Sequence, residues 1–147
     1  MDDYIAAKAQ IARYMKQDQT VYYHPTYENS KRVATMYGRA TARRYGIADD
    51  GGAYVNDGHF KIGDTQICSV DVMQIPGEHN IENACASISA AYEYTQDIVG
   101  IKNGLHDFTG LPHRLKLIRE VDGVKYFDDS YSSAPSAAIA AIRAHSQ

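Results

Sequence analysis

The sequence is poor in residues on which several protein classes depend. Its 147 residues include no Trp, two Cys and four Pro, and only 28 residues are Leu, Ile, Val or Phe. Two cysteines, Cys68 and Cys85, are too few for a disulfide framework or a four-cysteine zinc site. The shortage of large aliphatic side chains approaches the disordered range, but a net charge of only -3 argues against disorder. We therefore expect a folded chain with a thin core that leans on further protein.

Membrane, secretory and nucleic-acid-binding classes are also disfavoured. No apolar run approaches the roughly 18 residues of a transmembrane helix. The chain opens with Met-Asp-Asp-Tyr and no apolar stretch follows, unlike a signal peptide. A pI near 6.0 does not favour a general nucleic-acid binder. We expect a cytoplasmic protein whose partners include neither a membrane nor a nucleic acid.

Periodicity and turn signals predict a fold of the α/β class. We expect helices over residues 3–17, 27–45, 80–94 and 98–108, and a last helix that has Pro135 in its first turn and continues from Ala137 to Ala144. We expect strands over residues 21–24, 53–56, 59–62, 65–70, 72–75, 115–121 and 124–127. Gly63-Asp64 and Asp122-Gly123 indicate hairpin turns, and Gly46 the end of the second helix. Thr26 and Ser133 are the predicted caps of the second and last helices.

Four groups of polar residues are candidates for chemistry. Asn80 and Asn83 are three residues apart at the start of a helix, so they share a face. Their side-chain amides suit the edge of a base or a phosphate-bound water. Alternatively, Asn80 merely caps the helix. Arg114 follows a hinge-like Thr109-Gly110-Leu111-Pro112, where it would hold a phosphate or make an ordinary surface ion pair. His113 alone is too weak a signal to use.

The loop of residues 128–133, Asp-Asp-Ser-Tyr-Ser-Ser, follows a predicted strand and precedes a helix. Open α/β sheets bind ligands at such a position, where carboxylates accept ribose hydroxyls and helix N–H groups hold anions. A polar loop with a capping serine is the alternative, and the functional interpretation is slightly favoured because two acids end an otherwise apolar strand.

Two basic features are weaker. Lys8 lies among alanines, where a crowded lysine can lose its proton and become reactive, although a solvated lysine is the ordinary case. A stretch without acids carries five cations: Lys31, Arg32, Arg39, Arg43 and Arg44. We favour a solvated helix face over a phosphate-binding or nucleic-acid-binding patch for this stretch. The sequence has no P-loop, no G-x-G-x-x-G, no zinc-binding His spacing and no G-x-S-x-G around Ser130.

Taken together, four stretches resemble the Mur ligases, the ATP-dependent enzymes that add amino acids to the peptidoglycan precursor. They are Asp3 to Ile11 around Lys8, Gly77-Glu78-His79-Asn80 with Asn83-Ala84, Phe108 to Arg114 with its G-L-P-H-R core, and Phe127-Asp128-Asp129-Ser130. The likeness extends over nearly the whole chain. It implies the second half of the family's central ATPase domain over residues 1–110, lacking the P-loop, and the start of a Rossmann-like C-terminal domain over 111–147.

The resemblance also assigns roles to particular residues. It implies that Lys8 is carbamoylated and helps to hold Mg²⁺, and that His79, Asn80 and Asn83 surround the adenine nucleotide of ATP. It implies that Arg114 reaches the ATP phosphates and acts in catalysis with Lys8, and that Asp129 contacts the ribose. Ser130, Tyr131 and Ser133 are then expected to meet the incoming amino acid.

The implied reaction adds D-glutamate to UDP-N-acetylmuramoyl-L-alanine through an acyl phosphate. The remainder of the ligase chain is the implied partner, and without a P-loop we expect no ligation by this chain alone. The loop departs from a common N-D-S-K-A-T pattern at Asp128, Tyr131 and Ser133, which weakens the assignment of D-glutamate contacts. Asp-Asp-Ser-Tyr followed by Pro135 also resembles the dipeptide-adding member. A nucleotide-binding module without catalysis is the remaining alternative.

Overall fold

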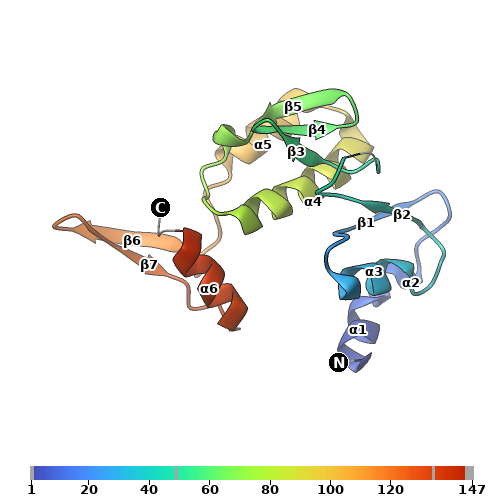
Figure 1. Ribbon diagram of the computed structural model, residues 1–147, viewed down its shortest axis with the longest axis horizontal. Coiled ribbons are helices and arrows are strands. Elements are labelled where there is room, and N and C mark those ends of the chain that lie inside the picture. The colour runs from blue at the N-terminus through green and yellow to red at the C-terminus, as the bar shows by residue number, and fades with distance from the viewer. Residues whose placement is uncertain (1, 49, 134, 145–147) are drawn as a thin grey trace.

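The structure is a computed structural model that describes residues 2–48, 50–133 and 135–144 (Figure 1). Its first part holds two short helices, a parallel strand pair and the helix that connects the strands: α1 (Asp2–Lys8), α2 (Gln10–Arg13), β1 (Thr20–Tyr23), α3 (Glu28–Thr35) and β2 (Thr41–Arg44). Buried Ile5, Ala9 and Ala12 hold the predicted stripe of the first helix. That helix is nevertheless shorter than predicted, because a turn at Ala9 divides it and it ends at Arg13.

The predicted helix over residues 27–45 is wrong in its second half. The helix α3 ends at Thr35, and Gly38 then adopts a φ of 57°, a left-handed conformation that suits glycine. Thr41–Arg44 form β2 instead, because they pair in parallel with β1 from Thr20 to Tyr23. Thr26 is not the cap either; Tyr27 occupies that position without a side-chain bond.

The second part is a three-stranded antiparallel sheet covered by two helices: β3 (Tyr54–Asn56), β4 (His59–Ile62), β5 (Thr65–Ser69), α4 (Glu78–Thr95) and α5 (Ile98–Asp107). The predicted turn at Gly63-Asp64 joins β4 to β5 as expected. The predicted strand over 72–75 is wrong, because the short helix η1 (Val70–Val72) includes its first residue and residues 73–75 are irregular. Ser69 caps η1, and its hydroxyl accepts the N–H of Asp71.

The core lies between this sheet and α4. Phe60 of β4, Ala53 before β3 and Ile88 of α4 are at most 1% exposed. The small residues that the sequence places on α4 allow this close packing, since Ala84 and Cys85 are buried in the same cluster. Cys68 and Cys85 are both free and buried.

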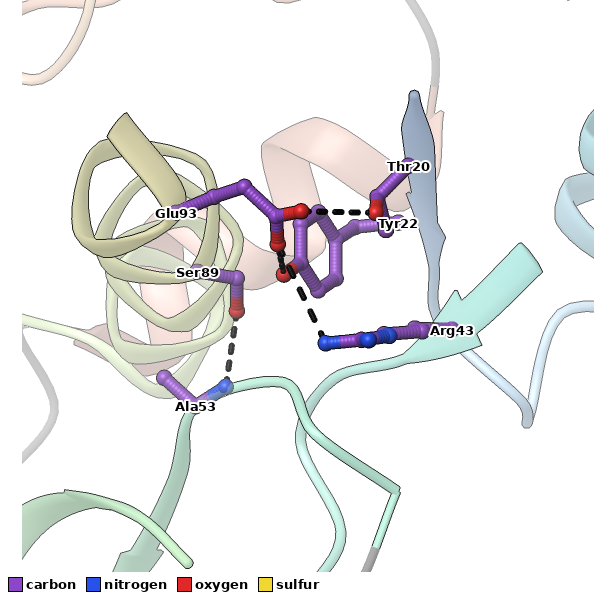
Figure 2. Close-up of polar contacts among 6 residues, drawn as sticks. All are labelled: Thr20, Tyr22, Arg43, Ala53, Ser89 and Glu93. Carbon is purple, nitrogen blue, oxygen red and sulfur yellow. Dashed lines mark hydrogen bonds and ion pairs between the residues drawn. The ribbon is translucent and has the colours of Figure 1, made fainter. Parts of the chain in front are cut away.

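The outer face of α4 is tied to the parallel strands by a carboxylate (Figure 2). Glu93 accepts hydrogen bonds from Thr20 Oγ1 at 2.8 Å and from Tyr22 Oη at 2.5 Å, and Arg43 lies 3.9 Å away. These donors lower the pKa of Glu93, while burial and the nearby carboxylate raise the pKa of Tyr22 to about 12. The polar contacts therefore fix α4 against β1 and β2.

The third part is a β-hairpin followed by a helix: β6 (Lys116–Val121), β7 (Val124–Asp128) and α6 (Pro135–Ala144). Asp122 and Gly123 have φ values of 50° and 78°, as the predicted two-residue turn requires. Figure 1 shows this part at the opposite end of the molecule from α1. Among the described residues, no helix is both long and apolar enough to cross a bilayer.

Candidate functional site

A cavity of about 940 Å³ lies between the second and third parts of the chain. One face of α4, the facing side of α5, the linker between α5 and β6, the loop after β7 and the alanine face of α6 all contribute to its wall. Its volume lies within the range of small-molecule sites. Its lining is mainly small or apolar, including Ile75, Ile88, Ile101, Leu105, Phe108, Leu111 and Ala141.

The polar end of the cavity is the start of α4. Gly77 precedes the helix with a φ of 103°, a backbone conformation that glycine adopts more readily than other residues. Because glycine has no side chain, the first N–H groups of α4 have no side-chain cap from this position. Asn80 does not cap the helix either, because its Nδ2 donates to the carbonyl of Pro76 at 2.6 Å. The alternative of a merely capping Asn80 is therefore wrong, and its Oδ1 accepts no hydrogen bond from the residues that the structure describes.

His79 and Asn83 line the cavity beside Asn80. Asn80, Asn83 and Ser87 are spaced by three or four residues, so they follow one face of α4. The hydroxyl of Ser87 donates to the backbone carbonyl of Asn83 at 3.0 Å and does not engage the Asn83 side-chain amide. One turn further, Ala84 and Ile88 belong both to the cavity wall and to the core.

The third part of the chain supplies the charged side of the cavity. Arg114 and Asp129 both line it, although they are 15 residues apart. Within the described residues, no carboxylate pairs with the Arg114 guanidinium, so its donors remain available to an anion. Asp129 accepts the N–H of Leu115 at 3.2 Å and the hydroxyl of Ser132. A carboxylate has about four acceptor positions, so Asp129 can accept a further hydroxyl.

Five residues that the sequence predicts for the nucleotide thus line one cavity: His79, Asn80, Asn83, Arg114 and Asp129. The other predicted site residues do not line it. Lys8 is exposed at the end of α1 with its Nζ 5.5 Å from the centre of the Tyr4 ring. Ser130, Tyr131 and Ser133 lie in the adjacent loop, where Ser132 faces the cavity instead.

The five cations of the basic stretch do not share a helix face. Arg32 pairs with Asp2 at 3.2 Å, Arg43 with Glu93, and Arg44 with Asp50 at 2.7 Å. The Arg44 guanidinium lowers the pKa of the Asp50 carboxyl. Because Arg43 and Arg44 belong to β2, the prediction of one solvated helix face is wrong, and three of the cations have acidic partners.

Sequence reasoning missed much of the cavity wall. Gly100 and Gly104 are four residues apart on α5 and line it, as does Ser132. Two glycines four residues apart leave one face of a helix without side chains at those positions, and this spacing was visible in the sequence. The apolar linker residues Phe108 and Leu111 carry no such signal, because only the tertiary fold brings them to α4.

The described residues do not form a complete metal site. They contain no group of three or more His, Cys, Asp or Glu side chains placed to hold a metal ion. Lys8 is the one residue of this chain that the resemblance assigns to Mg²⁺, so the other ligands of that site would have to come from outside the described residues.

Comparison with known proteins gives relatives over most of the chain. A UDP-N-acetylmuramoylalanine--D-glutamate ligase of Clostridium perfringens is 32% identical over 145 residues, which is 98% of this chain and 31% of that protein. The same-named protein of Caldanaerobacter subterraneus subsp. tengcongensis is 38% identical over 95 residues, 65% of this chain and 21% of that protein. The chain thus spans less than a third of the length of these curated relatives. No family model matches.

A solved structure shares the fold. The crystal structure of MurF from Acinetobacter baumannii superposes with a TM-score of 0.76 at 19% identity, covering 97% of this chain and 32% of that one. The expected α/β fold, with elements of a central domain followed by the start of a C-terminal one, is consistent with this likeness.

Proposed function

Since the chain belongs to the Mur ligase family, we propose that it is the nucleotide-contacting part of a UDP-N-acetylmuramoylalanine--D-glutamate ligase. The observation that carries the proposal is the convergence of His79, Asn80, Asn83, Arg114 and Asp129 on one cavity. Three separate segments supply these residues, and a chance polar surface would not gather them around an apolar hollow of this size.

The chemistry of the wall suits an adenine nucleotide. The apolar and small residues along α4 and α5 would bury a flat aromatic base, and the amides of Asn80 and Asn83 offer donors and acceptors to its edge. Asp129 would accept a ribose hydroxyl. Arg114 would hold phosphate oxygens, because a guanidinium presents several donors in a fixed planar fork.

The proposed reaction joins a carboxylate to an amine, and ATP supplies the phosphoryl group that activates the carboxylate. In such a transfer the protein acts mainly by positioning and by neutralising charge. Arg114 would counter charge on the transferred group. The linker at Gly110, whose φ is 93°, joins the two sides of the cavity and is the proposed pivot that brings them together.

D-glutamate is the proposed amino acid, because the relatives named above are D-glutamate ligases. UDP-N-acetylmuramoyl-L-alanine is the proposed acceptor. The domain division near residue 110 and the carbamate on Lys8 also stay proposals. Replacing Lys8 by Ala in a ligase that carries this segment should cut activity severely, with partial recovery in added short carboxylates; near-normal rates would contradict the role of Lys8.

Calorimetry of this chain with ADP and ATP tests the nucleotide site. Arg114→Ala should weaken binding by about tenfold or more, since a charge-assisted hydrogen bond contributes about 1.5–3 kcal/mol. Arg119→Ala is the matched control, because Arg119 lies on β6 over the ring of Tyr126 and outside the cavity wall. Asn83→Ala and Asn103→Ala form a second pair, since Asn103 is an exposed residue of α5 outside the wall.

Equal affinities in Arg114→Ala and Arg119→Ala, or no binding by the unmutated chain at millimolar nucleotide, would contradict the proposal. A second assay separates ligation from binding without chemistry. With ATP, Mg²⁺, UDP-N-acetylmuramoyl-L-alanine and D-glutamate, the chain alone should release no phosphate above the blank, because it has no P-loop. Steady release would overturn that expectation.

A further inference from the structure

The backbone on either side of Arg114 has an unusual conformation. His113 and Leu115 have φ values of 64° and 48°, although neither is glycine. Left-handed conformations are unfavourable for such residues and persist only where surrounding contacts hold them. The direction of the Arg114 side chain into the cavity depends on these two neighbours, because they set the path of the backbone that carries it.

The loop after β7 supplies the contacts that hold His113. Asp128 Oδ2 lies 2.8 Å from His113 Nδ1, and the N–H of Tyr131 donates to the His113 carbonyl at 3.1 Å. The ring of Tyr131 lies beside the imidazole, with centroids 5.0 Å apart. The imidazole, carbonyl and ring face of His113 thus all contact one short segment.

The same loop holds Leu115 and orders itself. Asp129 Oδ1 accepts the N–H of Leu115, and Asp128 Oδ1 accepts the N–H of Ser130 at 3.0 Å. The hydrogen bonds of Ser130 and His113 lower the pKa of the Asp128 carboxyl, so it is ionised at neutral pH. Two consecutive carboxylates and the N–H of Tyr131 therefore hold the residues before and after Arg114, and we call these contacts the linker clasp.

We propose that Asp128 is a positioning residue, which acts through His113 to hold residues 113–115 in the conformation that directs Arg114 into the cavity. This inference rests on the proposed function, because it takes the phosphates of a nucleotide as the target of Arg114. Asp128 itself does not line the cavity, whereas Arg114 and Asp129 do. The linker clasp also attaches the residues around Arg114 to the loop after β7.

A double-mutant cycle with ADP and adenosine tests the role of Asp128. Asp128→Ala should weaken ADP binding by about two- to fivefold, the range that exposed charge pairs produce. It should leave adenosine affinity unchanged, because adenosine has no phosphate for Arg114 to hold. In the Arg114→Ala background, Asp128→Ala should have no further effect on ADP.

Asp107→Ala is the matched control. Asp107 makes the same kind of exposed contact, 2.9 Å from His106 Nδ1, but it lies at the end of α5 and outside the linker clasp. It should leave ADP affinity unchanged. Equal losses for ADP and adenosine in Asp128→Ala, or an undiminished loss in the Arg114→Ala background, would overturn the proposal.

Amide hydrogen exchange measured by NMR makes the test independent of nucleotide binding. The N–H groups of Leu115 and Tyr131 are donors in the linker clasp, so Asp128→Ala should accelerate their exchange by about two- to fivefold. Unchanged exchange at both amides would overturn the proposal even if ADP binds. Failure of the unmutated chain to bind ADP would instead count against the proposed function, while accelerated exchange would still show that Asp128 holds the linker.

Discussion

Ser89 gives the sharpest test of how α4 is attached to the sheet. The residue is 1% exposed, and its hydroxyl accepts the N–H of Ala53 at 2.7 Å (Figure 2). The same hydroxyl donates to the carbonyl of Cys85 at 2.7 Å. Ala53 is fully buried, so Ser89→Ala would leave its N–H without this acceptor and without access to water. An unsatisfied buried donor costs about 1–3 kcal/mol.

Part of that loss is offset, because alanine is the better helix former by about 0.5 kcal/mol. We therefore expect Ser89→Ala to lower the free energy of unfolding by about 1–2 kcal/mol. Urea unfolding of this chain, followed by far-ultraviolet circular dichroism, measures the change. The chain has no Trp, so fluorescence would depend on its 12 Tyr.

Ser87→Ala is the matched control on the same helix. The Ser87 hydroxyl is exposed and donates only to the Asn83 carbonyl one turn earlier, so its removal leaves no buried group unsatisfied. We expect a change within about 0.5 kcal/mol in either direction. If Ser89→Ala costs no more than Ser87→Ala, the Ala53 N–H has found another partner and the reasoning is refuted.

Three further predictions concern stability and reactivity. Gly52→Ala should prevent stable folding in the same urea assay, because a Cβ there would lie 2.2 Å from the Arg44 carbonyl oxygen, whereas Gly104→Ala, with open space around it, should fold. Burial raises the pKa of Cys85 to about 11, so iodoacetamide near neutral pH should label it only after unfolding. The pKa of Tyr22 is raised from 10.0 to about 12, so its contribution to stability is complete below pH 10.0 and is lost as the pH rises toward 12. The midpoint of urea unfolding should therefore fall over this pH range, and it should fall less in Tyr22→Phe.

Elements set by local signals were predictable from the sequence. The turns at Gly63-Asp64 and Asp122-Gly123 need only residues that accept a positive φ, and both hairpins form as expected. The strand Thr41–Arg44 was not predictable in this way, because it depends on pairing with Thr20–Tyr23, some 20 residues earlier. Its run of cations suits a helix surface locally, and only the nonlocal ladder overrides that preference.

The candidate site divides in the same manner. Motif spacing predicted the chemistry of Asn80, Asn83 and Arg114, and the structure gathers these residues at one cavity. The left-handed backbone at Leu115 and the contact of His113 with Asp128 were beyond prediction, because leucine does not signal a positive φ and the contact joins residues 15 positions apart. Sequence reasoning therefore identified several polar groups that face the cavity, but neither most of the apolar wall nor the contacts that hold the loop around Arg114.

Ala84 and Ile88 belong both to the hydrophobic core and to the wall of the cavity, since each packs in the core cluster and also lines the cavity. A larger side chain introduced to tighten the interior would push into the space of a bound base, and a smaller one introduced to enlarge that space would loosen the interior. For the proposed nucleotide, binding affinity and stability are therefore coupled at these two positions, and a substitution at either one should change both.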